Sequence, residues 1–201
     1  MLQIYLVRHG QDEDNEKGIL NGRRNKPLTK LGVERARQLA LKIEKAGIIF
    51  NKVYSSPLQR AYKTAKVITD ELGLEKPEKL DNLIERDFGK FSGVLIEKAA
   101  VASRPNTLIT RTVEYVLEPE GGETFPDLLR RGKKVLKLIR SKHKKGNVLL
   151  VTHGDIGKMI YAQFYGLKWK EVLNGFHFGN SELLQLSTNT KPKDISVFKT
   201  K

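Results

Sequence analysis

The chain has 201 residues, 37 of them Lys or Arg and 23 Asp or Glu, so its formal net charge is +14. It contains no Cys, which excludes a disulfide scaffold, thiolate metal sites and a Cys nucleophile. With 39% hydrophobic residues it can bury a core, and its length fits a single domain over residues 1–201. No apolar run approaches the ~20 residues that span a bilayer, and the N-terminus lacks the basic start of a signal peptide, so we expect a soluble, cytoplasmic protein without membrane partners.

The predicted elements alternate between short β-type runs and longer segments of helical periodicity. In chain order they are a strand at Leu2–Val7, a helix at Leu28–Ala46, a strand at Lys52–Ser55, a helix at Ser56–Leu72, a helix at Thr124–Lys144, a strand at Asn147–Thr152, a helix at Asp155–Tyr165, and strands at Glu182–Leu186 and Ile195–Phe198. Thr29 is placed as an N-cap, and Pro57 in a first helical turn. Residues 74–120 are irregular, and we expect a small cap-like insertion at about 85–120. The alternation predicts a three-layer α/β/α sandwich with a mostly parallel central sheet.

The positive charge, with an isoelectric point near 9.9, suits an anionic partner. The densest basic run lies between Arg130 and Lys145, where apolar residues recur at helical spacing. That pattern is typical of the solvated face of an amphipathic helix. No aromatic residue punctuates the run as a base-stacking surface would require, so nucleic acid is not the expected partner.

Two predicted strands end in the same chemical way. The first runs into Arg8-His9-Gly10, and the strand that ends at Thr152 runs into His153-Gly154. Ligands of open α/β sheets bind beyond the carboxyl ends of the strands, and Gly there lets the backbone approach a ligand closely. A helix that begins at Asp155 would aim its free N–H groups at an anion in the same crevice. If the two strands are neighbours, the sequence predicts an anion site between His9 and His153.

Further blocks follow in a fixed order along the chain. They are Pro27-Leu28-Thr29-Lys30-Leu31-Gly32, Ser55-Ser56-Pro57-Leu58-Gln59-Arg60-Ala61, Glu85-Arg86-Asp87-Phe88-Gly89 and Gly121-Gly122-Glu123-Thr124. Together with Leu6-Val7-Arg8-His9-Gly10-Gln11 and Val151-Thr152-His153-Gly154, the chain from Leu2 to Leu186 resembles the histidine phosphatase superfamily, also called the phosphoglycerate mutase-like family. A lone Arg-His-Gly would be weak evidence, whereas these blocks in order are specific.

The resemblance implies that His9 is a nucleophile that becomes phosphorylated, and that Glu85 protonates the leaving-group oxygen and later activates water. It implies that Arg8, Arg60 and His153 take part in catalysis by surrounding the phosphoryl group. It further implies that the phosphate is bound by Arg8, Asn15, Arg60, His153 and Gly154. Two more positions are implied to bind the substrate, Gly22 and Arg86. The place of Glu85 in its block favours it over Asp87. The family's chemistry implies neither a metal nor a cofactor.

The residue types suit these roles on physical grounds. Phosphoryl transfer depends mainly on positioning and on neutralisation of negative charge, which two guanidiniums, an imidazolium at His153 and helix N–H groups can supply without Mg²⁺. The same cations disfavour protonation of His9, and a backbone carbonyl is expected to fix its tautomer. One departure is Asp12, where many relatives have Ser or Thr; with its neighbours it is expected to place acidic groups near the mouth of the site.

The family contains both mutases and phosphatases. In this chain the segment from Phe91 to Pro119 is short, and its bases are Lys98, Arg104 and Arg111. A short cap leaves the site open to water, which turns a phosphohistidine enzyme into a hydrolase, so we expect a phosphatase acting on a small phosphorylated substrate. The alternative is phosphoglycerate mutase-type phosphoryl transfer. A more remote one is a non-catalytic basic binding module, disfavoured because every catalytic position is filled. The sequence does not predict an oligomeric state.

Overall fold

The computed structural model describes residues 1–111, 113–189, 191–192 and 196–198. Its strands are β1 (Leu2–Arg8), β2 (Lys52–Ser55), β3 (Glu78–Lys79), β4 (Thr107–Ile109), β5 (Glu114–Val116), β6 (Gly146–Thr152), β7 (Leu183–Leu186) and β8 (Ser196–Phe198). Its α-helices are α1 (Glu13–Glu16), α2 (Lys30–Lys45), α3 (Gln59–Glu71), α4 (Ile96–Ser103), α5 (Phe125–Lys142), α6 (Gly154–Tyr165) and α7 (Trp169–Gly175), and short 3₁₀ helices lie at η1 (Asp81–Leu83) and η2 (Gly89–Phe91). Ile195, where the last strand was expected to begin, lies outside the described residues.

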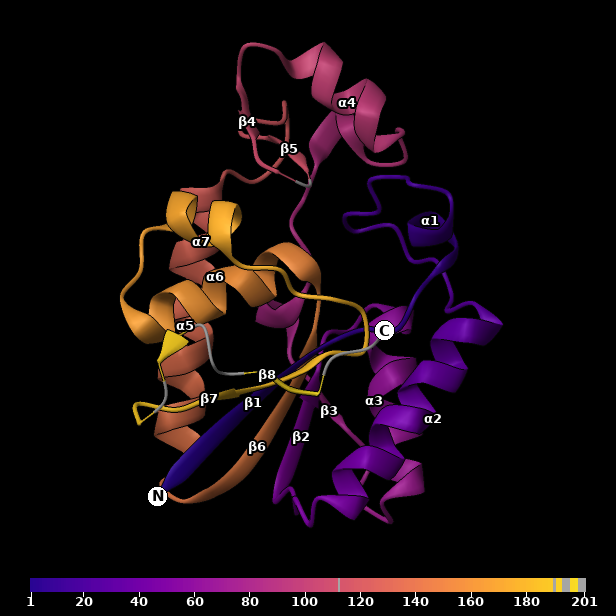
Figure 1. Ribbon diagram of the computed structural model, residues 1–201, viewed down its shortest axis with the longest axis vertical. Coiled ribbons are helices and arrows are strands. Elements are labelled where there is room, and N and C mark those ends of the chain that lie inside the picture. Colours follow the sequence, from indigo (N-terminus) through magenta and orange to yellow (C-terminus); the bar gives the residue numbers. More distant parts are fainter. Residues whose placement is uncertain (112, 190, 193–195, 199–201) are drawn as a thin grey trace.

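The central sheet has the strand order β3-β2-β6-β1-β7-β8. The pairs β3–β2, β2–β6 and β6–β1 are parallel, whereas β7 runs antiparallel to β1 and to β8. Helices α5, α6 and α7 cover one face of this sheet, and α2 and α3 cover the other (Figure 1). The predicted three-layer α/β/α sandwich with a mostly parallel sheet is therefore confirmed.

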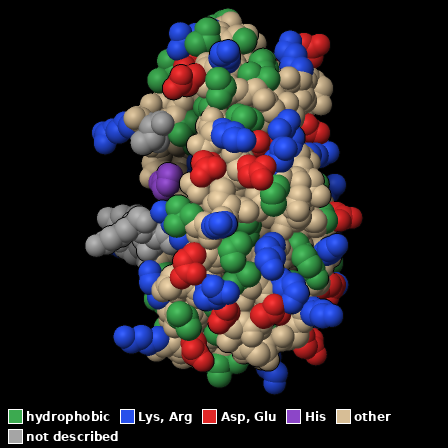
Figure 2. All heavy atoms as spheres, turned by 90° about the vertical axis from the view of Figure 1, so that its right-hand side faces the viewer, with side chains coloured by type: hydrophobic (Ala, Val, Ile, Leu, Met, Phe, Trp, Pro, Cys, Tyr) green, Lys and Arg blue, Asp and Glu red, His purple; other side chains and the backbone are tan. Residues whose placement is uncertain are grey.

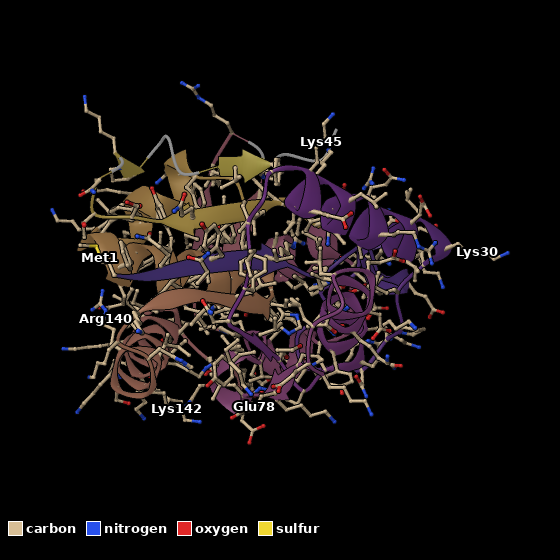
Figure 3. All side chains as sticks on the ribbon, turned by 90° about the horizontal axis from the view of Figure 1, so that it is seen from below. Met1, Lys30, Lys45, Glu78, Arg140 and Lys142 are labelled. Carbon is tan, nitrogen blue, oxygen red and sulfur yellow. The ribbon has the colours of Figure 1, made fainter. Side chains whose placement is uncertain are left out.

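Alternating side chains of the central strands fill both sides of the sheet. On β1, Ile4 and Leu6 belong to the core under α5 and α6, whereas Tyr5 and Val7 belong to the core under α2 and α3. This two-sided burial follows from the two-residue period of a strand, and it explains why β1 and β6 read as continuous apolar runs. The outer faces of the helices carry the charge. Figure 3 shows four exposed basic side chains at the periphery of the layers: Lys30, Lys45, Arg140 and Lys142.

Local signals fix most helix starts as expected, with one correction. The Thr29 side chain accepts a hydrogen bond from Gly32 N at 3.0 Å and caps α2, as predicted. The prediction of a helix from Ser56 was wrong, because α3 begins at Gln59 and Pro57 lies before its N-cap. Ser56 instead prolongs β2, since its N–H donates to Val151 O on the neighbouring strand at 3.0 Å. That extended backbone brings Ser56 to the carboxyl end of the sheet.

A small subdomain lies beyond the carboxyl ends of the central strands. Helix α4 and the separate two-stranded sheet β4–β5 form it, and they stand at the top of Figure 1. Backbone hydrogen bonds tie it to the loop after α1, with Leu20 N donating to Val94 O at 2.9 Å and Gly93 N donating to Leu20 O at 2.8 Å. The irregular composition of this region hid both α4 and the β4–β5 pair from the sequence analysis.

Basic side chains are spread over the face that carries α2 and α3, with acidic side chains between them (Figure 2). Two of these cations have carboxylate partners on that face, as in the pairs Arg37–Glu71 at 2.8 Å and Lys66–Asp70 at 2.6 Å. No helix within the described part of the chain is both long and apolar enough to cross a bilayer.

Candidate active site

The pairing of β1 with β6 brings the two predicted histidines together. Arg8 is in register with Thr152, so His9 and His153 leave the sheet at the same level. His9 N donates to Thr152 O at 2.9 Å, and the centroids of the two imidazole rings lie 4.9 Å apart. The adjacency that the sequence only suggested is thereby confirmed.

His9 is oriented as a nucleophile. Its Nδ1 lies 2.6 Å from the carbonyl oxygen of Gly10, and because that oxygen can only accept, Nδ1 carries the proton and Nε2 carries the lone pair. Burial, followed by the charges of Arg60 and Arg8, lowers the pKa of His9 well below 6.5. The ring is therefore neutral at physiological pH. The backbone carbonyl that was expected to fix its tautomer is that of the next residue, Gly10.

His153 differs from the expectation. The Arg60 Nε–H can only donate, so His153 Nδ1 accepts it at 3.2 Å, and His153 Nε2 lies 2.7 Å from the hydroxyl of Ser56. Burial and the neighbouring cations lower the pKa of His153 well below 6.5. His153 is therefore a neutral imidazole in this structure, and the imidazolium expected from the sequence is corrected. A phosphate dianion at the site would favour its protonation again.

Arg60 lies at the centre of the site as predicted, fully buried between the two rings. Its Nε is 3.3 Å from His9 Nε2, and its terminal nitrogens donate to the carbonyl oxygens of Gly22 at 2.7 Å and Arg24 at 2.6 Å. Gly22 thus reaches the site through its backbone oxygen, and its positive φ of 54° allows that turn.

Asp12 does not lie at the mouth of the site. Its side chain is 0% exposed, and its Oδ2 accepts from Asn21 Nδ2 at 2.6 Å and lies 3.3 Å from Arg60 Nε. Its Oδ1 caps α1 by accepting from Asn15 N at 2.8 Å. The expected acidic rim is therefore corrected: Asp12 is a buried counter-ion of Arg60. The position of an Asp three residues before Asn15, where an N-cap is favoured, was the signal available in the sequence.

The arginines of the loop before α2 are paired with carboxylates. Arg23 lies 3.3 Å from a carboxylate oxygen of Asp87 and 3.2 Å from one of Glu123, and Arg24 lies 2.8 Å from Asp14. These ion pairs hold the loop whose carbonyls bind Arg60.

One donor at the site has no partner. Arg8 Nη1 donates to Phe178 O at 2.9 Å, but Arg8 Nε is buried and makes no hydrogen bond within the described residues. An unsatisfied buried donor is costly unless a ligand completes it. Nearby, α6 begins at Gly154, and its N-cap His153 makes no side-chain capping bond; the Glu85 carboxylate accepts from the next two N–H groups, so the Gly154 N–H is the one left at the cavity.

Asn15 lies at the same cavity, with its amide already oriented. Asn180 Nδ2 donates to Asn15 Oδ1 at 3.1 Å and to His9 O at 2.8 Å. Because the amide oxygen of Asn15 is engaged, its NH₂ group is the part left to donate. Asn180 was not singled out in the sequence, since it follows a strand-free aromatic segment far from the other motifs.

Glu85 is buried beside the N-terminus of α6. Its carboxylate accepts from Arg86 N at 2.8 Å, Ile156 N at 3.2 Å and Asp155 N at 3.3 Å. Burial, and then the charge of Asp155, raises the pKa of Glu85 above 4.5 despite these donors. A carboxyl group with a raised pKa is suited to donate a proton at neutral pH.

Arg131 on α5 holds the Glu85 segment in place. Its guanidinium donates to the carbonyl oxygens of Asn82 at 3.0 Å, Ile84, and Glu85 at 3.2 Å, and to the Glu123 carboxylate at 2.7 Å. The sequence analysis assigned this residue to a solvated helix face. That interpretation is wrong for Arg131, because helical spacing does not reveal that a loop folds against this position.

Arg86 lies at the cavity wall but is not placed to grip a substrate. It is 0% exposed, its three nitrogens donate to the carbonyl oxygens of Glu123, Val116 and Leu117 at 2.7 to 2.8 Å, and its guanidinium stacks 3.9 Å from the ring of Phe125. With all three nitrogens engaged, this geometry does not favour the substrate-binding role that the resemblance implies for Arg86. Arg86 joins the β4–β5 subdomain to the core.

We expect Arg86→Met to lower the free energy of unfolding by about 3–5 kcal/mol, because it leaves buried carbonyl oxygens without donors. Urea denaturation followed by circular dichroism measures this loss. Arg130→Met, at an exposed position one residue before Arg131, is the matched control and should change stability by less than about 0.5 kcal/mol. Equal stability of the two variants would contradict the anchoring role.

The functional groups converge on one cavity of about 180 Å³. Its floor carries Arg8, His9, Arg60, Glu85 and Gly154. Its outer wall comes from the loop before α2 and from β5. This volume is smaller than the ~300–1,000 Å³ typical of pockets for drug-sized ligands, so it fits a compact molecule.

Comparison with known proteins gives a consistent result. The sequence profile described as "Histidine phosphatase superfamily (branch 1)" matches residues 4–200. The chain is 33% identical over 188 residues to the "Putative phosphoserine phosphatase 2" of Hydrogenobacter thermophilus, covering 92% of this chain and 89% of the relative. It is also 33% identical over 177 residues to a "2,3-bisphosphoglycerate-dependent phosphoglycerate mutase" of Parvibaculum lavamentivorans, covering 85% and 83%.

Solved structures agree on the fold. A mycobacterial glucosyl-3-phosphoglycerate phosphatase matches with a TM-score of 0.76 and 25% identity, covering 92% of each chain. A phosphoserine phosphatase from Entamoeba histolytica in complex with phosphoserine matches with a TM-score of 0.74 and 22% identity, covering 92% of this chain and 90% of the other.

Proposed function

The chain belongs to the histidine phosphatase superfamily, and on that premise we propose that it is a metal-independent phosphomonoester hydrolase that acts through a phosphohistidine on His9. The observation that carries the proposal is that two groups lie at the same cavity: His9 Nε2, which carries no proton, and Arg8 Nε, a buried donor without an acceptor among the described residues. The first group supplies a nucleophile, and the second supplies an empty position for a phosphate oxygen.

The reaction divides into two displacements. In the first, the lone pair of His9 Nε2 forms a bond to phosphorus, the ester P–O bond breaks, and the Glu85 carboxyl gives its proton to the leaving oxygen. In the second, the Glu85 carboxylate takes a proton from water, the water oxygen bonds to phosphorus, and the N–P bond breaks. Arg8, Arg60, Asn15 and the Gly154 N–H would hold the phosphoryl oxygens throughout.

Hydrolysis is favoured over mutase chemistry by the composition of the cavity wall. Of the bases expected in the cap, neither Lys98 nor Arg104 nor Arg111 lines this cavity, and Arg104 is paired with Glu114 at 2.8 Å. Apart from Arg86, whose guanidinium is held by carbonyl oxygens, the cap offers the cavity no cation within the part described. A mutase must retain its intermediate against water, and a short cap without such a cation at the cavity gives little means to do so.

The test is phosphate release in EDTA, without any bisphosphoglycerate. We expect turnover of p-nitrophenyl phosphate and of one or more small phosphorylated metabolites under these conditions, because no step requires a metal. The alternative, mutase-type transfer, predicts no phosphate release but interconversion of 2- and 3-phosphoglycerate once 2,3-bisphosphoglycerate is added. That second result would overturn the proposal, and the curated mutase relatives make it the appropriate comparison.

A further inference from the structure

A lysine on α6 occupies an unusual environment within the cavity. Lys158 is one helical turn beyond Gly154, is 7% exposed, and lines the same cavity as His9 and Glu85. A buried ammonium normally has a carboxylate partner, because an unpaired charge loses its hydration without compensation. The described residues place no carboxylate oxygen within 4.0 Å of Lys158 Nζ.

The hydrogen-bond partner of Lys158 is a neutral phenol. Lys158 Nζ donates to the hydroxyl oxygen of Tyr115 at 2.6 Å, and it lies 5.0 Å from the centroid of the same ring. Tyr115 stands on β5 in the cap, so this contact joins the cap to α6. The Tyr115 hydroxyl accepts from the ammonium, and its own proton has no acceptor among the residues described. A hydroxyl that accepts from a cation becomes a stronger donor.

Asp155 is the nearest acid on the same helix, but it is engaged elsewhere. One of its carboxylate oxygens lies 3.7 Å from Arg86, and its charge contributes to the raised pKa of Glu85. Burial lowers the pKa of Lys158 below its ordinary value of 10.5, although the charges of Asp155 and Glu85 oppose this shift. The cation thus stays within reach of the phosphate site without being neutralised by a direct ion pair.

We propose that Lys158 and Tyr115 form a subsite for a carboxylate on the leaving group, so that the substrate is a small phosphorylated carboxylic acid. The proposal rests on the proposed phosphomonoester chemistry of this cavity and adds its leaving-group half. Two donors 2.6 Å apart match the two oxygens of one carboxylate. One compact cation matches a monoanion, whereas the phosphoryl half has two guanidiniums and a helix N-terminus. The cavity volume of about 180 Å³ limits the connecting part to a few atoms.

Binding to the full-length His9→Ala variant tests the subsite without turnover. The probes are 3-phosphoglycerate and glycerol 3-phosphate, which differ in having a carboxylate or a hydroxymethyl group at the same end. Isothermal titration is expected to give a dissociation constant about 10- to 100-fold lower for 3-phosphoglycerate. Adding Lys158→Met is expected to reduce this ratio to within about threefold of one, since Met has a similar shape without the charge.

Lys137→Met, at an exposed position on α5, is the matched control and should leave the ratio unchanged. Tyr115→Phe should lower the ratio several-fold, and it decides the question if Lys158→Met does not fold. A ratio near one in the His9→Ala background, or an equal loss of affinity for both probes in the Lys158 and Tyr115 variants, would overturn the subsite. Because the readout is binding, the subsite can stand if hydrolysis is not found, and hydrolysis can stand if the subsite fails.

Discussion

Replacing His9 by Ala is expected to lower the turnover of every phosphomonoester by at least about 10⁴-fold, because the first displacement loses its nucleophile. The geometry offers no direct substitute. His153 is the other imidazole of the site, but it does not line the cavity as His9 does, and its Nε2 lies 2.7 Å from the hydroxyl of Ser56. Steady-state phosphate release from p-nitrophenyl phosphate measures the loss.

A matched control for His9→Ala is His143→Ala. His143 lies at the far end of α5, where its ring contacts the hydroxyl of Tyr54 at 2.9 Å, remote from the cavity. Its replacement should leave turnover within about twofold of the native value. Intact-mass measurement during turnover should detect a phosphoryl adduct on native protein and none on His9→Ala. Substantial hydrolysis by His9→Ala would contradict the assignment of the nucleophile.

Glu85→Gln is expected to lower turnover of alkyl phosphates by about 10²–10⁴-fold, because an alkoxide is a poor leaving group without a proton donor. The loss with p-nitrophenyl phosphate should be smaller by at least about tenfold, since p-nitrophenolate leaves without protonation. The Gln side chain keeps the shape and an oxygen acceptor for the α6 N–H groups. The split between the two substrates therefore separates proton donation from structural support.

Asp87→Asn is the control that decides between the two carboxylates of the Glu85 block. Asp87 accepts from Gly89 N at 2.9 Å and pairs with Arg23, and it does not line the cavity. Its replacement should leave the ratio of the two substrates unchanged. A greater loss in Asp87→Asn than in Glu85→Gln would reverse the assignment.

The pH profile gives an independent readout of the same pair of groups. The pKa of Glu85 is raised above 4.5, so its protonated, proton-donating form persists to higher pH, and kcat/KM should fall as the pH rises through that raised value. The pKa of His9 is lowered well below 6.5, so loss of the neutral nucleophile should begin only as the pH falls below 6.5. In Glu85→Gln the fall of kcat/KM that is due to deprotonation of Glu85 should disappear. Ionisation of the substrate affects the profiles of the native protein and of the variant alike.

The sequence alone determined the framework of this site. Apolar runs of strand length ending in Arg8-His9-Gly10 and His153-Gly154 predicted two buried parallel strands with functional groups at their carboxyl ends, and the pairing of β1 with β6 confirmed it. Strand ends, caps and short motifs are local features, and local features are written in neighbouring residues. The alternation of strand and helix then restricted the fold to an α/β sandwich.

Only the tertiary structure decided which charges meet. Asp12, Arg86 and Arg131 read as solvated charges or substrate contacts, yet the folded chain buries them as a counter-ion of Arg60 and as anchors of distant carbonyl groups. Lys158 was not singled out in the sequence, because its partner Tyr115 comes from the cap. These contacts join residues 30 to 48 positions apart, and the desolvation that changes a pKa depends on everything packed around the group. Neither the long-range contacts nor the desolvation of a group is contained in the local pattern of the sequence.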